Sequence, residues 1–243
     1  MKVTGFSFVR KAIGFNDSII EAINSILPIC DDFIVAVGQS DNATMELIKT
    51  IDSPKIKIIE TAWEDSVHEG GKVLAVEIDK AFQSIPADSD WAFYIQGDEI
   101  IHKKYRDTIY NEMLRWKNNQ KVDGLLFKYK HSLNTYNHID LSTRWCRNEI
   151  RVIKNNKDIH FYHNAQSFRK GNNQRLNVKS IDAYVYHYDS SKHSYVLKPK
   201  IKMKNWKFDY DLSPDKLSII RRLKIFMDNN FWLNIPRKNY KIV

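Results

Sequence analysis

The chain has 243 residues, 43% hydrophobic and 28% charged, which is typical of one α/β domain or of one domain with an appendage. Its two cysteines, Cys30 and Cys146, lack metal-type spacing and argue against a disulfide framework or a zinc site. No stretch approaches the ~20 apolar residues of a membrane span, and residues 1–7 lack a secretory apolar run, so we expect a cytoplasmic protein. The net charge of +9 favours an anionic partner, such as a sugar nucleotide, a nucleic acid or an anionic membrane leaflet.

The first hundred residues alternate β-type apolar runs with amphipathic helical runs. The cap Asn16-Asp17-Ser18 precedes the first helical run, and Pro28 ends it. Strands are predicted at 2–9, 33–37, 55–60 and 91–95, and helices at 19–27, 44–50 and 72–83. This alternation predicts a mostly parallel sheet with helices on both faces.

The second half is less regular, so we expect mixed strand directions there. An amphipathic helix is predicted over 105–116, and strands are predicted at 124–129, 151–153 and 183–188. Near the C-terminus, Ser213 and Pro214 cap a further helix whose apolar face carries Leu217, Ile220, Leu223 and Met227.

The segment Trp91–Glu99 is the most informative part of the chain. A buried strand ends there at Gln96-Gly97, and two acids, Asp98 and Glu99, follow. Ligands of open α/β sheets bind at the carboxyl ends of the strands, where a carboxylate can hold a divalent cation. The alternative is a plain turn after a core strand.

The order of several segments resembles glycosyltransferase family 2. The first strand, the turn 38–44, the loop and helix with Gly70-Gly71, and residues 94–99 match in order, followed by 144–151, 165–169 and 185–188. The resemblance implies a GT-A type α/β fold over 1–207, with a Rossmann-like mixed central sheet flanked by helices, and a C-terminal helical appendage over 208–243. It further implies a hexosyltransferase-type enzyme that moves a sugar from a nucleotide-diphosphate sugar to a hydroxyl acceptor in cell-surface polysaccharide or glycan synthesis.

The metal motif of that family is Asp-x-Asp, and here the triplet is Gln96-Gly97-Asp98. The match implies that Asp98 contacts the Mn²⁺ or Mg²⁺ that bridges the diphosphate. His187 resembles the late histidine that many GT-A enzymes add to the metal shell, and a structural role is its alternative. Gln96 can hydrogen-bond a donor hydroxyl, and Glu99 can supply a second charge. The acidic pair that contacts uracil in the family is absent, which leaves the donor base open.

The catalytic base and the phosphate-binding groups are less clearly marked. Glu149 is the candidate base, and its alternative is an ion pair with Arg147 or Arg151. His163 and Asp182 are weaker choices. Four arginines can bind diphosphate or an anionic acceptor, and a solvated face is their alternative: Arg144, Arg147, Arg151 and Arg169.

The partners that follow are a nucleotide sugar and a glycan or lipid-linked acceptor. The basic C-terminus predicts peripheral contact with the inner membrane face, with packing against its own domain as the alternative. Three rival classes stay open. A nucleic-acid binder is not expected, because no recognition motif is present. A nucleotidyltransferase would carry a glycine-rich loop, which is missing at residues 8–12, and the third rival is a degenerate transferase that binds a sugar nucleotide without turnover.

Overall fold

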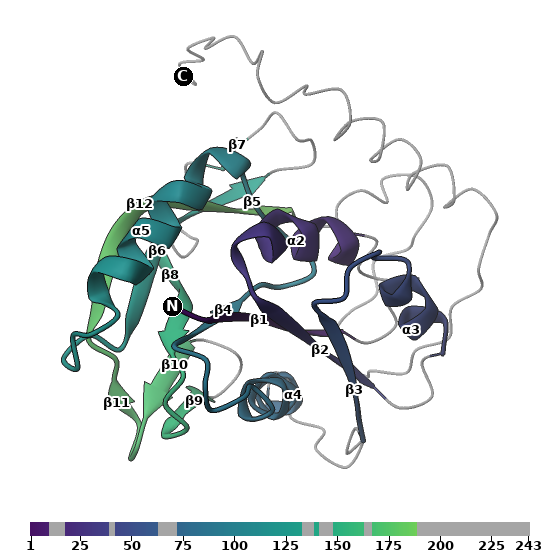
Figure 1. Ribbon diagram of the computed structural model, residues 1–243, viewed down its shortest axis with the longest axis horizontal. Helices are drawn as coiled ribbons and strands as arrows, with labels where there is room; N and C mark the ends of the chain where they lie inside the picture. Colours follow the sequence, from purple (N-terminus) through teal and green to yellow (C-terminus); the bar gives the residue numbers. More distant parts are fainter. Residues whose placement is uncertain are drawn as a thin grey trace, which may run out of the picture. The chain divides into compact units, whose positions relative to one another are not determined.

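The computed structural model describes residues 1–9, 18–38, 42–62, 72–132, 139–140, 148–162 and 167–188 (Figure 1). All of these residues belong to the unit formed by residues 1–201, and the description below concerns that unit alone. The predicted boundary at 207 and the predicted C-terminal helix lie outside the described residues.

The first half forms the parallel part of a large sheet, as predicted. Strand β1 pairs in parallel with β2 and β4, and β2 pairs in parallel with β3. The strands are β1 (Val3–Val9), β2 (Asp32–Gly38), β3 (Ile56–Thr61) and β4 (Trp91–Tyr94), and the helices between them are α2 (Ile19–Ile26), α3 (Asn42–Lys49) and α4 (Lys72–Gln83). The carboxyl ends of the four strands therefore lie along one edge.

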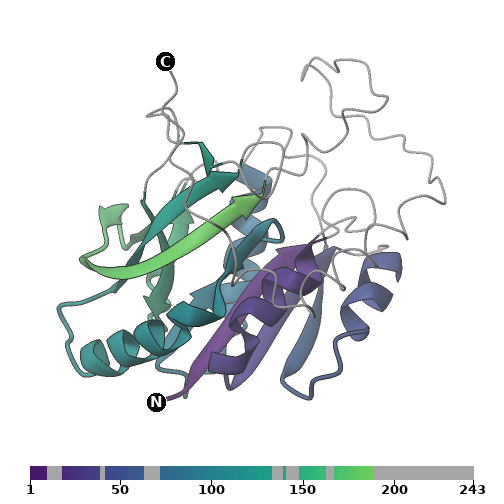
Figure 2. The same cartoon turned by 90° about the horizontal axis from the view of Figure 1, so that it is seen from above.

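The second half completes the sheet with mixed strand directions, which confirms the prediction. The described residues give the order β3-β2-β1-β4-β8-β6-β12-β5, with β7 beside β6. The long neighbouring strands β6 and β12 run parallel (Figure 2). Strands β8 and β5 run antiparallel to their neighbours. The added elements are β5 (Glu99–Ile101), α5 (Arg106–Trp116), β6 (Gly124–Ser132), β7 (Ile139–Asp140), β8 (Asn148–Lys154) and β12 (Val178–Tyr188).

Two apolar clusters pack against opposite faces of the sheet. On one face, α2, α3 and α5 bury residues such as Ile23, Ile48 and Met113 against the sheet. On the other face, Phe82 of α4 packs with Phe6 of β1, next to a three-stranded sheet of β9 (Ile159–Tyr162), β10 (Ser167–Lys170) and β11 (Gln174–Arg175) (Figure 1). The predicted α/β fold class, with a mixed central sheet flanked by helices, is confirmed by this strand order.

Several short elements were not predicted from the sequence. Strand β5 has only three residues, and β9 and β10 have four each, so none offers enough alternation to be recognised. Strands β6, β8 and β12 extend beyond their predicted limits. Within the described ranges, no helix is both long and apolar enough to span a lipid bilayer.

Candidate functional site

The turn after β4 is fixed by hydrogen bonds from three directions. The Ser7 hydroxyl of β1 donates to the Ile95 carbonyl at 2.8 Å, and the Ser18 hydroxyl before α2 donates to the Gly97 carbonyl at 2.6 Å. Within the turn, the Gln96 N–H donates to Glu99 Oε2 at 3.2 Å. The buried run Trp91–Ile95 therefore ends in a tightly held loop that presents Asp98 at the carboxyl edge of the sheet.

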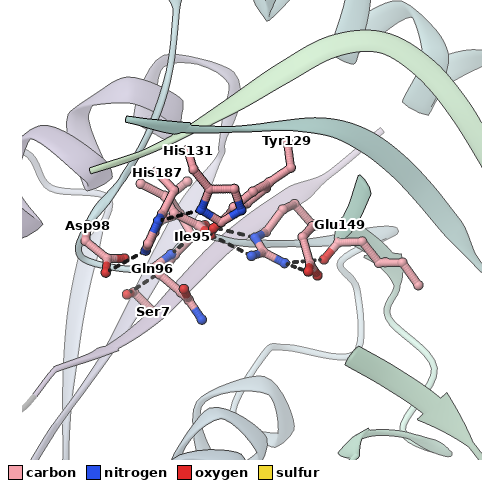
Figure 3. Close-up of polar contacts among 11 residues, drawn as sticks. Ser7, Ile95, Gln96, Asp98, Tyr129, His131, Glu149 and His187 are labelled. Carbon is pink, nitrogen blue, oxygen red and sulfur yellow. Dashed lines mark hydrogen bonds and ion pairs between the residues drawn. The ribbon is translucent and has the colours of Figure 1, made fainter. Parts of the chain in front are cut away.

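Asp98 and His187 face each other across this edge (Figure 3). The Asp98 Oδ2 and His187 Nε2 atoms are 3.1 Å apart, although the two residues are 89 positions apart in the sequence. Their side chains are 27% and 21% exposed, so both are partly accessible to a ligand. The structure thus brings together the two residues that the sequence analysis proposed as metal ligands.

Two further rings line the same face beside His187. Strands β6 and β12 place His131 opposite His187, and Tyr129 lies two positions earlier on β6. The Nδ1 atoms of the two histidines are 3.2 Å apart, and the Tyr129 ring is stacked near His187 at a centroid distance of 5.8 Å (Figure 3). Neither Tyr129 nor His131 was singled out from the sequence, because no motif marks them and only the strand register places them here.

A buried ion pair between Arg151 and Glu99 contacts one of these rings through the Tyr129 hydroxyl. Arg151 of β8 donates to Glu99 through Nε at 2.8 Å and through Nη2 at 2.5 Å, with side chains 5% and 0% exposed. The Tyr129 hydroxyl donates a short hydrogen bond to Glu99 as well. Glu99 was expected to supply a second charge to a ligand, but its oxygens are engaged by Arg151 and Tyr129.

The ion pair keeps its charged form despite burial. Burial opposes ionisation of Glu99, but the charge of Arg151 and the hydrogen bonds from Arg151 and Tyr129 outweigh it and lower the Glu99 pKa. Burial likewise opposes the charge of Arg151, and Glu99 raises the Arg151 pKa well above its usual value. The pKa of Tyr129 is raised by burial and by the neighbouring Glu99 charge, so this phenol stays protonated as a hydrogen-bond donor.

Glu149 lies at the end of the same network. Arg151 Nη1 is 3.3 Å from Glu149 Oε2, so one guanidinium bridges the two carboxylates of Glu99 and Glu149. The alternative prediction for Glu149, a partner of Arg151, is therefore observed. Its side chain is 16% exposed, which leaves part of the carboxylate accessible.

Asp98 and His187 offer one carboxylate oxygen and one imidazole nitrogen, which could supply two ligands to a divalent cation. Neighbouring ligands of an octahedral ion with bonds of about 2.1 Å lie about 3 Å apart, and the 3.1 Å between Asp98 Oδ2 and His187 Nε2 matches that spacing. Among the described residues, no group of three or more His, Cys, Asp or Glu side chains is arranged to hold a metal ion. The remaining positions of such a cation would fall to water and to a ligand.

Other predicted site residues are distributed differently. Gln96 is partly exposed in the same turn, whereas Arg144, Arg147 and the weaker base His163 lie outside the described residues. Asp182 is exposed and forms an ion pair with Lys128 at 2.7 Å, so it does not join the cluster around Asp98.

Among known proteins, the chain has matches only with solved structures. No family model matches it, and no curated protein matches it. A structure of Staphylococcus aureus TarS 1–349 in complex with UDP aligns with a TM-score of 0.48 and 14% identity, over 95% of this chain and 66% of that chain. This chain therefore spans less than two thirds of the TarS structure.

Two further solved structures are similar. A 4-diphosphocytidyl-2C-methyl-D-erythritol synthase from Anaerococcus prevotii DSM 20548 aligns with a TM-score of 0.46 and 9% identity, over 75% of this chain and 87% of that chain. Glucosyl-3-phosphoglycerate synthase from Mycobacterium tuberculosis, in complex with Mn²⁺, UDP and phosphoglyceric acid, aligns with a TM-score of 0.35 and 14% identity, over 54% and 43%. At these values the activity has to be argued from the site itself.

Proposed function

We propose that the protein is a glycosyltransferase that moves a sugar from a nucleotide-diphosphate sugar to a hydroxyl acceptor. The observation that carries this proposal is the pairing of Asp98 with His187 at the carboxyl edge of the parallel strands. Ligands of open α/β sheets bind at this edge. The pair is partly exposed and rests on a rigid buried network, which suits a preorganised binding site.

The chemistry requires that negative charge on the departing diphosphate be offset. A divalent cation supplies that charge when it is bound. Asp98 and His187 are the residues that would hold it, and Gln96 in the same turn would hydrogen-bond a hydroxyl of the donor. The buried carboxylate of Glu99 acts indirectly, because its contacts with Arg151 and Tyr129 tie β5, which directly follows Asp98, to β8 and β6.

Glu149 would serve as the general base for the acceptor hydroxyl. Arg151 Nη1 lies 3.3 Å from Glu149 Oε2, and this contact orients the Glu149 carboxylate. The same contact favours a second candidate function, a protein that binds a sugar nucleotide without turnover, because an ion-paired carboxylate is a weaker base. Replacing Glu149 with glutamine separates the two, since only an active transferase would lose product formation while keeping donor affinity.

The acceptor in this proposal is a glycan or a lipid-linked glycan of cell-surface polysaccharide synthesis. Arg144 and Arg147 would contact the diphosphate or an anionic acceptor, and the basic C-terminus would bring the protein to the inner face of the membrane. We propose a cytoplasmic location on this basis. These assignments rest on the sequence alone.

Calorimetry with UDP and GDP tests the donor site. We expect tighter binding with Mn²⁺ or Mg²⁺ than with EDTA, because the cation joins the protein carboxylate to the diphosphate. Asp98→Asn should remove this difference and abolish transfer while leaving the fold intact, because it removes charge and keeps volume. Asp88→Asn is the matched control, since Asp88 is an exposed carboxylate that pairs with Lys2 at the opposite end of the strands. Full transfer activity in Asp98→Asn would refute the proposed role of Asp98.

A further inference from the structure

Lysine and tyrosine side chains gather on the face of β6 and β12 that points away from the candidate site. Side chains alternate between the two faces of a strand, so Lys128 and Lys130 point to the face opposite to that of Tyr129. The register partners of these two lysines on β12 are Tyr184 and Tyr186. The cluster therefore shares its strands with the candidate site but faces the other way.

A short helical turn, η2 (Lys103–Tyr105), extends this cluster at the edge of the sheet. It follows β5, which pairs with β12. The Tyr105 and Tyr184 rings lie 5.8 Å apart between their centroids, and the Lys104 ammonium lies 4.8 Å from the centre of the Tyr105 ring. The lysine–tyrosine face, as it is called below, comprises Lys104, Tyr105, Lys128, Lys130, Tyr184 and Tyr186.

The tyrosine rings hold the ammonium groups of the lysines close together. Lys130 Nζ lies 4.2 Å from the centre of the Tyr184 ring and 5.6 Å from that of the Tyr186 ring. Lys128 Nζ lies 5.2 Å from the centre of the Tyr184 ring. An ammonium group within about 6 Å of a ring centroid is attracted by the ring. Two lysines of neighbouring positions on one strand face are therefore drawn to the same aromatic ring.

The positive charge of this face exceeds its negative charge. Asp182 pairs with Lys128 at 2.7 Å, and its own side chain is 82% exposed. Within the described ranges, the side chains of Lys104 and Lys130 contact tyrosine rings and form no ion pair with an acidic residue. Burial lowers the Lys130 pKa, and the charges of Lys104 and Lys128 lower it further. An anion bound among these ammonium groups would relieve their mutual repulsion.

The ring contacts favour phosphate headgroups over a sugar chain as that anion. A sugar ring stacks on an open aromatic face, whereas the Tyr184 ring is already in contact with Lys128, Lys130 and Tyr105. A phosphate headgroup needs only cations within reach. Tyrosine is also enriched where proteins meet the boundary between membrane and water, and lysine stems bury along apolar surface while their charges stay in water.

We propose that the lysine–tyrosine face binds the headgroups of an anionic lipid bilayer. This docking surface goes beyond the proposed sugar transfer, and it lies within the described unit rather than in the basic C-terminal segment. Tyr186 directly precedes His187 in β12. A bilayer bound on this face would therefore lie beside the carboxyl edge of the sheet, where a lipid-linked acceptor would be presented.

Co-sedimentation of the full chain with vesicles tests this surface. The vesicles contain equal parts of phosphatidylglycerol and phosphatidylcholine, and pure phosphatidylcholine vesicles are the neutral arm. Loss of one lysine charge near an anionic surface weakens binding by about fivefold, so Lys104→Gln/Lys130→Gln should bind about 30-fold more weakly. Asp182→Asn should bind about fivefold more tightly, because the repulsion of its carboxylate is removed and Lys128 is released. The double variant with arginine at positions 104 and 130 should stay within about threefold of the native protein.

Lys49→Gln/Lys57→Gln is the matched control, because it removes the same net charge elsewhere. Both lysines are about half exposed, and Lys57 belongs to β3, at the other end of the strand order. The control should bind the anionic vesicles like the native protein. Equal weakening in the two glutamine double variants would overturn the proposal, because net charge would be the cause. Equal binding of the native protein to both kinds of vesicle, or binding to neither, would overturn it as well.

Dextran sulfate, a soluble polyanion, separates a membrane from an acidic polymer as the partner. If Lys104→Gln/Lys130→Gln loses affinity for dextran sulfate but not for the anionic vesicles, the partner is a polymer and the proposal is wrong. If this variant fails to fold, as judged by circular dichroism, Lys104→Gln alone and Asp182→Asn carry the test through shifts in opposite directions.

Calorimetry with UDP and Mn²⁺ keeps this inference apart from the proposed function. Lys104→Gln/Lys130→Gln should keep the native affinity for UDP, because its substituted side chains lie away from Asp98 and His187. Weaker vesicle binding with unchanged UDP affinity supports the docking surface. If the native protein does not bind UDP but shows the expected vesicle results, the proposed function fails and the docking surface stands.

Discussion

Replacing Arg151 with methionine is expected to destabilise the fold by about 3–5 kcal/mol at neutral pH, the usual range for breaking a buried ion pair from one side. The structure places this case within that range because Glu99 is fully buried and Arg151 supplies two of its hydrogen bonds, at 2.8 and 2.5 Å. Methionine fills a similar apolar volume. The loss of stability therefore arises mainly because the buried Glu99 carboxylate is left without a compensating charge. Glu149 loses its contact with Arg151 as well.

The destabilisation should grow with pH. In the native protein the Glu99 pKa is lowered, so Glu99 contributes stability above its unfolded pKa of 4.5, and this is lost as the pH falls through the folded pKa. Without Arg151, burial raises the Glu99 pKa above 4.5, and the variant loses stability as the pH rises through this raised pKa. Both effects act in the same direction.

Urea unfolding followed by circular dichroism, at about pH 5 and about pH 7.5, measures this difference. Lys128→Met is the control, because Lys128 belongs to an exposed ion pair with Asp182 and should change the midpoint little. The double variant Glu99→Gln/Arg151→Met should lose less stability than the sum of its single variants. An Arg151→Met variant within about 1 kcal/mol of the native protein at both pH values would refute the buried-pair reasoning.

Three further outcomes are expected. Burial raises the Asp79 pKa to about 6, so ionisation of Asp79 costs stability as the pH rises through that value. Asp79→Asn keeps an acceptor for the Phe161 N–H, and should stabilise the fold by about 1–2 kcal/mol at alkaline pH, after allowance for solvent screening, and not at all at about pH 4. Urea unfolding midpoints at the two pH values measure this difference. Gly124→Ala should lower the melting temperature with a loss of about 1–3 kcal/mol, because its Cβ would lie 2.6 Å from the Val152 carbonyl oxygen, and an unchanged thermal scan would contradict the close approach of the strands. Deleting residues 213–243 should reduce co-sedimentation with anionic liposomes while leaving nucleotide affinity unchanged, and failure of the truncated chain to fold would instead assign the segment to the core.

The sequence predicted the parallel half of the fold because its signals there are local. Runs such as Phe33–Val37 are long enough to mark buried strands, and the helices between them carry clear apolar faces. Strand β5 could not be recognised, because three residues give no period. Because β5 was not predicted, the antiparallel pairing of β5 with β12 that places Glu99 beside His187 could not be predicted either.

The candidate site was predictable only in part, for a related reason. Asp98 was found from its position after a buried strand, and His187 from a family resemblance, but no local pattern indicated that they are 3.1 Å apart. The alternation of Leu125, Phe127 and Tyr129 does place them on one face of β6, and His131 continues that face past the predicted end of the strand. Which residue they meet on β12 depends on register, and register is a long-range property.

The parallel pairing of β6 with β12 determines when the site can exist during synthesis. His131 and His187 are 56 positions apart, and Asp98 and His187 are 89 positions apart. His187 is synthesised last of the three, so it completes contacts with segments made much earlier. Chains fold from the N-terminus as they emerge, at about 5–20 residues per second. The β1–β4 layer is therefore available for several seconds before β12 arrives, with the carboxylate of Glu99 still lacking Arg151 for part of that time. A nascent chain halted before β8 would carry the Glu99 carboxylate without the Arg151 side chain that neutralises it in the folded protein.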